Sequence, residues 1–206
     1  MLYFTKRFWR AELALGLAFL FSVAASAAGF SLDCARVRGE VLRLHVLADS
    51  NSPADQALKL QVRDAVLRAG NTLFDGSTTA ESARARLAAQ TDELTAAARA
   101  VLRENGSDAD VDIRVTEEYF ATRSYEDVTL PAGRYTAVKV VIGSGAGQNW
   151  WCVMFPPMCL PAAEGEAVDA DAYWDEEEYA VVSQNPQYEP RFKIVEWAQL
   201  LRERWR

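Results

Sequence analysis

Alternating apolar and polar side chains predict four β-strands. In residues 41–47 the even positions are leucine or valine and share one face, while Arg43 and His45 share the other. The same alternation recurs at 111–116. Residues 134–142 form a nearly continuous β-branched run, which is typical of a central strand. Another apolar stretch covers 150–155, and the glycine-rich segment 143–147 before it predicts a flexible loop.

Two helices are predicted between the first and second strands. Ser52 is a suitable N-cap and Pro53 fits the first helical position, so a helix should run from 53 to about 69. We expect Gln56, Lys59 and Arg63 on its solvent side. A second, longer helix is predicted from about 77 to 104, because apolar residues recur there every seven positions.

The order of these elements predicts the fold class. Strand, two helices and three strands indicate an α+β domain over residues 40–160, with a mostly antiparallel sheet of about four strands and two helices on one face. We expect a tether at 28–39, an acidic loop at 161–190 and a C-terminal amphipathic helix at 191–206.

The first thirty residues have the organisation of an export signal. Three basic residues precede the apolar stretch 13–23, and Ala25-Ser26-Ala27 is typical of a signal-peptidase site, so residues 1–27 are predicted to be a signal peptide. The alternative is an uncleaved signal anchor over 13–30. The net charge of −7 becomes more negative if the signal is removed, and an acidic chain does not suit nucleic-acid binding.

Candidate chemistry is sparse. Cys152 and Cys159 flank a Phe-Pro-Pro segment and could form a disulfide in an oxidising compartment, although free thiols are the alternative; Cys34 is left over. His45 is the single histidine, and a Cys-His nucleophile pair would need it beside Cys152 or Cys159. Neither metal-ligand spacing nor a phosphate-binding loop is present, so no metal, cofactor or small-molecule substrate is predicted.

Two adjacent tryptophans are the most conspicuous aromatic feature. Trp150 and Trp151 must face opposite sides of a strand. If both faces of the sheet are covered, both side chains belong to the core. If one face is open, one tryptophan is an exposed anchor for a binding partner.

Two long segments carry a family resemblance. LRLHVLADSNS at 42–52 with its continuation to 66, and LPAGRYTAV at 130–138 with NWWCVMFPPMCL at 149–160, resemble the stage II sporulation protein R family. The resemblance implies an exported signalling protein, not an enzyme, secreted across the forespore membrane into the space between forespore and mother cell. Its implied partner is a membrane-embedded aspartic protease that processes the pro-form of the mother-cell sigma factor, sigma-E.

The resemblance implies no catalytic residues. For contact with the partner we expect Arg43 and His45 first, with a polar surface and the two tryptophans beside them. The full set of candidates is Arg43, His45, Asp49, Asn51, Gln56, Lys59, Arg63, Trp150 and Trp151. The competing hypothesis is an exported cysteine- or histidine-dependent hydrolase that acts at the cell wall.

Overall fold

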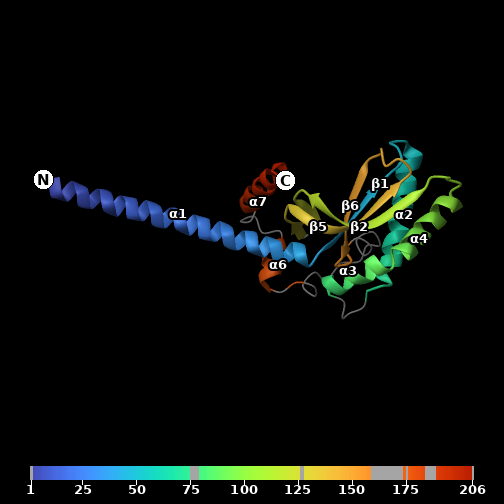
Figure 1. The fold of residues 1–206 in the computed structure, drawn as a ribbon, viewed down its shortest axis with the longest axis horizontal. Coiled ribbons are helices and arrows are strands. Elements are labelled where there is room, and N and C mark those ends of the chain that lie inside the picture. Colours follow the sequence, from blue (N-terminus) through green and yellow to red (C-terminus); the bar gives the residue numbers. More distant parts are fainter. Residues whose placement is uncertain are drawn as a thin grey trace.

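A four-stranded sheet forms the centre of the molecule. The computed structural model describes residues 2–74, 79–125, 128–158, 174, 176–183 and 189–205. The strand order is β2-β5-β1-β6, with β1 and β5 parallel and the other two pairs antiparallel (Figure 1). The strands are β1 (Leu42–Leu47), β2 (Val111–Phe120), β5 (Gly133–Ile142) and β6 (Asn149–Phe155). The α+β class with a mostly antiparallel sheet is therefore confirmed, and β5 is central as predicted.

A short ribbon extends the connection between β2 and β5. It consists of β3 (Arg123–Tyr125) and β4 (Val128–Leu130), which pair in antiparallel fashion. The sequence pattern did not reveal these strands, because each is only three residues long.

Three helices cover one face of the sheet (Figure 1). They are α2 (Pro53–Asn71), α3 (Ala80–Ala89) and α4 (Thr91–Glu104). Ser52 caps α2 as expected, because its hydroxyl accepts a hydrogen bond from the backbone N–H of Asp55 at 3.0 Å. Beneath the helices lie Leu42, Leu44 and Val46, so the alternation in the first strand is confirmed.

The single long helix expected at 77–104 is wrong, because it breaks at Gln90. The φ of Gln90 is −119°, outside the helical range. The hydroxyl of Thr91 donates to the carbonyl oxygens of Leu87 at 3.1 Å and Ala88 at 3.2 Å, where it competes with the backbone amides that would continue the helix. Each half still buries a leucine, Leu87 in α3 and Leu94 in α4.

The other face of the sheet is covered by a second core that the sequence did not predict. It is formed by the last turns of α1 (Leu2–Gly39), by α6 (Glu176–Val182) and by α7 (Glu189–Arg204). Residues 28–39, expected to be a tether, are instead the end of helix α1. Phe30, Cys34 and Val37 are buried there and pack this end of the helix on the sheet. The ring of Phe30 meets that of Phe192 edge to face at 5.4 Å.

The acidic segment 161–190 is also not a simple loop. It contains α6, whose Val181 and Val182 are buried in the second core together with Trp174. The rest of that segment, apart from Ser183 and the first residues of α7, lies outside the described residues. The expected C-terminal helix is confirmed as α7.

The N-terminal helix α1 runs far out from the body of the molecule (Figure 1). Its stretch Glu12–Gly39 is long and apolar enough to cross a membrane, judged by length and composition. This agrees with an export signal. The choice between a cleaved signal and a retained anchor stays a prediction.

Replacing Leu44 by alanine should lower the free energy of unfolding by about 2–5 kcal/mol, because Leu44 is fully buried in the first core and the change leaves a cavity. Leu200→Ala is the matched control, since Leu200 is half exposed on α7, and it should shift the value by less than about 0.5 kcal/mol. Urea unfolding of the full chain in mild detergent measures both. Equal effects of the two substitutions would contradict the assigned core.

Candidate functional site

A clamp joins the end of β1 to the loop between β5 and β6. Since β1 and β5 are parallel neighbours, their carboxyl ends lie at the same edge of the sheet. The Asp49 carboxylate accepts hydrogen bonds from the backbone N–H of Ser144 at 2.7 Å and from its hydroxyl at 2.8 Å. The carbonyl oxygens of Asp49 and Ala48 accept from the amides of Ala146 and Gly147. We call Asp49, Ser144 and the loop 143–147 the Asp49 clamp.

The glycines of the clamp are needed for space and conformation. A Cβ atom on Gly147 would lie 2.3 Å from the carbonyl oxygen of Ser50, which is backbone and cannot move aside easily. Gly143 has a φ of 55°, in the left-handed region that favours glycine. The glycine-rich loop therefore binds its own chain. The bonds from Ser144 also hold the pKa of Asp49 below its ordinary value.

Side chains from the first turns of α2 bind the backbone on both sides of the Asp49 clamp. The Gln56 side-chain amide donates to the carbonyl oxygen of Ser50 at 2.8 Å. The Lys59 ammonium donates to the Gln56 side-chain oxygen at 2.6 Å and to the carbonyl oxygen of Gln148 at 3.0 Å. Lys59 is 4% exposed, so its expected place on the solvent side of α2 is wrong. Burial and the positive charge of Arg63 lower the pKa of Lys59.

One tryptophan lies at the surface beside the clamp. Trp150 is 36% exposed, and the Arg63 guanidinium lies 4.6 Å from the centre of its ring. Arg63 also pairs with Asp64 at 2.6 Å. We call Arg63, Asp64 and Trp150 the Trp150 surface. Asn51 is exposed on the turn before α2.

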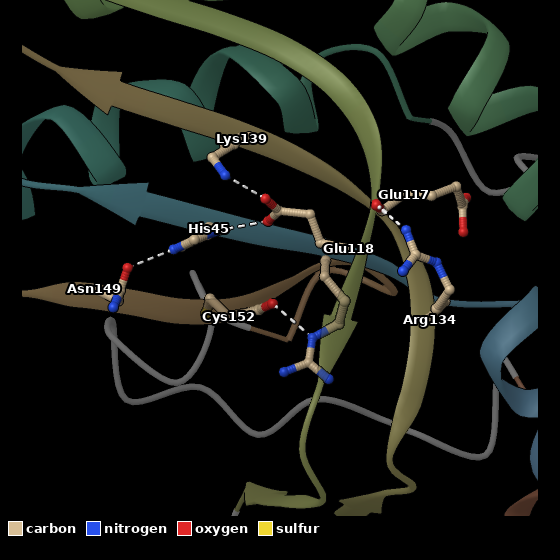
Figure 2. Close-up of polar contacts among 8 residues, drawn as sticks. His45, Glu117, Glu118, Arg134, Lys139, Asn149 and Cys152 are labelled. Carbon is tan, nitrogen blue, oxygen red and sulfur yellow. Dashed lines mark hydrogen bonds and ion pairs between the residues drawn. The ribbon is translucent and has the colours of Figure 1, made fainter. Parts of the chain in front are cut away.

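The opposite face of the sheet carries a connected polar network (Figure 2). The Glu118 carboxylate receives Lys139 Nζ at 2.5 Å on one oxygen and His45 Nδ1 at 2.7 Å on the other. His45 Nε2 lies 2.7 Å from the side-chain oxygen of Asn149. Burial alone would raise the pKa of Glu118, but the hydrogen bonds from Lys139 and His45 outweigh it and hold that pKa below its ordinary value.

Aromatic rings enclose this network. Trp151 stacks on the His45 ring with the centroids 3.7 Å apart and meets Phe120 edge to face at 4.9 Å. His45 is 5% exposed. The imidazole is therefore held inside the fold beneath the half-buried Trp151, and of the two tryptophans Trp150 is the more exposed.

Arg43 is fully buried in an aromatic cage. Its guanidinium carbon lies 4.3 Å from the centre of the Phe120 ring and 5.2 Å from that of Tyr135. Arg43 Nε donates to the carbonyl oxygen of Cys152 at 3.1 Å, whereas Nη1 has no hydrogen-bond partner among the described residues. Burial lowers the pKa of Arg43. Arg43 and His45 are both buried in this structure. Neither side chain can therefore contact a partner directly, although both were the first expected contact residues.

The residues of the competing hydrolase hypothesis are not brought together. His45 pairs in register with Trp151, so the adjacent Cys152 points to the other face of the sheet, beneath the helices. Cys152 is disulfide-bonded and therefore has no thiol to act as a nucleophile. Its expected partner Cys159 lies outside the described residues, so that pairing stays a prediction. Cys34 is free and buried.

Among the described residues no group of three or more His, Cys, Asp or Glu side chains could hold a metal ion. Three members of the polar network, Glu118, Lys139 and Asn149, were not predicted from the sequence. Strand alternation could have revealed two of them. It places Glu118 of β2 and Lys139 of β5 on the same face of the sheet as His45.

The comparisons with known proteins agree with the resemblance. The family model described as stage II sporulation protein R matches residues 38–164. A curated protein named stage II sporulation protein R, from Bacillus subtilis (strain 168), is 37% identical over 130 residues, which cover 63% of this chain. The alignment spans 58% of that relative, less than two thirds of its length. No solved structure matches the chain.

Replacing Glu118 by glutamine should lower the free energy of unfolding at pH 7 by about 1.5–3 kcal/mol, because charged hydrogen bonds from Lys139 and His45 are weakened. The pKa of Glu118 is depressed in the folded state, so its contribution is present above its ordinary pKa and is lost as the pH falls through the folded value. The difference between wild type and Glu118→Gln should therefore shrink from pH 7 to pH 3.

Glu117→Gln is the matched control, since Glu117 is exposed on the other side of β2. It should change the unfolding free energy little, and with less pH dependence. Urea unfolding at a series of pH values measures all three proteins. A constant difference between wild type and Glu118→Gln across this range would contradict the assigned role of the carboxylate.

Proposed function

The chain belongs to the stage II sporulation protein R family, and from this premise we propose that it is the exported signal that activates a membrane-embedded aspartic protease during sporulation. That protease would then process the pro-form of sigma-E. The protein would act from the space between forespore and mother cell, by contact and without chemistry of its own.

The N-terminal helix supports a site of action outside the cytoplasm of the producing cell. Its apolar stretch is exposed, whereas its last turns bury Phe30, Cys34 and Val37 in the body of the protein. An export signal of this kind directs the chain to the far side of a membrane, where a membrane-embedded partner exposes its outer surface.

The observation that carries the proposal is the exposed Trp150 on a rigid support. Tryptophan and arginine are the residues most often found at binding hot spots. The Asp49 clamp and the bond from Lys59 to the carbonyl oxygen of Gln148 fix the backbone before Trp150. A preorganised aromatic side chain loses little conformational entropy when a partner covers it. The Trp150 surface is therefore the contact site that we propose.

The geometry counts against the hydrolase hypothesis. Cys152 is in a disulfide, and it faces away from His45. The His45 ring is enclosed by Trp151 and by its two hydrogen-bond partners. A general base needs access to the proton that it removes, and this imidazole has no such access.

Replacing Trp150 by alanine should abolish most sigma-factor processing in sporulating cells, because a hot-spot truncation of about 2 kcal/mol or more weakens binding at least about thirtyfold. Arg103→Ala, an exposed change at the end of α4, is the surface control, and cells that carry it should process the sigma factor normally. Immunoblots of the sigma factor measure processing, and the amount of exported protein is measured in parallel.

His45→Gln separates the two hypotheses, because glutamine can still bond to neighbouring groups but cannot act as a base. We expect processing to persist when the variant is folded and exported. Loss of processing with normal folding and export would favour the hydrolase. Unchanged processing with Trp150→Ala, and no protein captured by a photocrosslinker at position 150, would remove the proposed contact site.

A further inference from the structure

The C-terminal helix α7 has two apolar faces. Phe192 and Val195 are buried against the body of the protein. A second stripe, spaced by three, four and four residues, lies on the other side and consists of Ile194, Trp197 and Leu201 of α7 and of Trp205 directly after its end. Trp197 is 70% exposed and Trp205 is 87% exposed. A helix at the surface of a water-soluble domain needs only one apolar face, so the second stripe indicates another apolar environment.

The charged residues of α7 are sorted between the two faces. At about 100° per residue, Lys193 and Arg204 lie along one border of the exposed stripe and Arg202 lies along the other. All three are exposed. The two acidic residues of α7 whose side chains are described, Glu196 and Glu203, are less exposed, although Glu196 pairs with Lys193 at 3.2 Å. Glu203 accepts a hydrogen bond from Arg134 at 2.8 Å, and Glu196 is half-buried. The outward face of α7 is therefore apolar with a basic border.

This face is continuous with the apolar surface of α1. An open cleft of about 340 Å³ lies between the two helices, lined by Val23, Ala27 and Phe30 of α1 and by Ile194 of α7. Beyond this point toward the N-terminus, the large apolar side chains of α1 are exposed. Figure 1 shows α7 beside α1, next to the part of α1 that leaves the body. The stripe on α7 thus begins where the membrane-spanning candidate meets the folded domain.

We infer that the outward face of α7 is a membrane-binding surface that lies in the interfacial layer of an anionic bilayer, beside the entry point of α1. Tryptophan is enriched at that depth because its ring is apolar and its N–H is polar. Basic residues along an apolar stripe are the pattern of helices that lie in the plane of anionic lipid surfaces. This inference does not depend on the proposed function, because it concerns lipid contact alone.

Spin labels on the full chain test the inference. Single cysteines replace Trp197 or Leu201 on the stripe, and Glu104, exposed on α4, provides the matched control away from α7. The labelled chains are reconstituted into vesicles of phosphatidylglycerol and phosphatidylcholine. Collisions with oxygen, which concentrates in lipid, are compared with collisions with a water-soluble nickel complex. The chain without an added cysteine measures any background labelling of the buried Cys34.

Labels at 197 and 201 should collide more with oxygen than with nickel, whereas the label at 104 should show the reverse. Charge reversal by Lys193→Glu with Arg204→Glu should raise, several-fold, the ratio of nickel collisions to oxygen collisions for the label at 201. Nickel accessibility at 197 and 201 equal to that at 104 overturns the inference, whether or not a label at Leu17 shows α1 inserted. An unchanged label at 201 after charge reversal overturns the role of anionic lipid.

Discussion

The parallel pairing of β1 with β5 determines where everything else in the domain can lie. It brings the end of β1 and the end of β5 to one edge of the sheet, so that Asp49 meets the loop 143–147 directly. The chain must then turn back as β6 on the free side of β1, which places Trp150 next to α2. The exposed tryptophan is thus a consequence of strand order, fixed by backbone pairing and not by its own packing.

A sheet covered on both faces also explains the buried polar side chains. Arg43 and His45 point away from the first core and would be in water if the second face were open. The last turns of α1, α6 and α7 close that face, so each polar group needs partners within the fold. His45 has Glu118 and Asn149, whereas Arg43 relies on aromatic rings and two oxygen acceptors. Such networks favour a single arrangement, since a misplaced strand would leave a buried polar group without its partners.

Local secondary structure could be predicted from the sequence, whereas contacts between residues far apart in the chain could not. Strand alternation at β1 and the cap at Ser52 depend on neighbouring residues, and both predictions were right. The burial of Lys59 depends on the carbonyl oxygen of Gln148, 89 positions away. The break at Gln90 is an exception, because it lies beside a local bond from Thr91 to Leu87 that the spacing of apolar residues does not reveal. The second core was missed because an apolar segment after an export signal gives no indication that Phe30, Cys34 and Val37 pack against the sheet.

The position of Cys34 gives the domain an internal reporter. The thiol is completely shielded where α1 packs on the second core. An intermolecular disulfide through this thiol would require α1 to leave the body first. The rate at which Cys34 reacts with an external reagent therefore measures how often the N-terminal helix detaches.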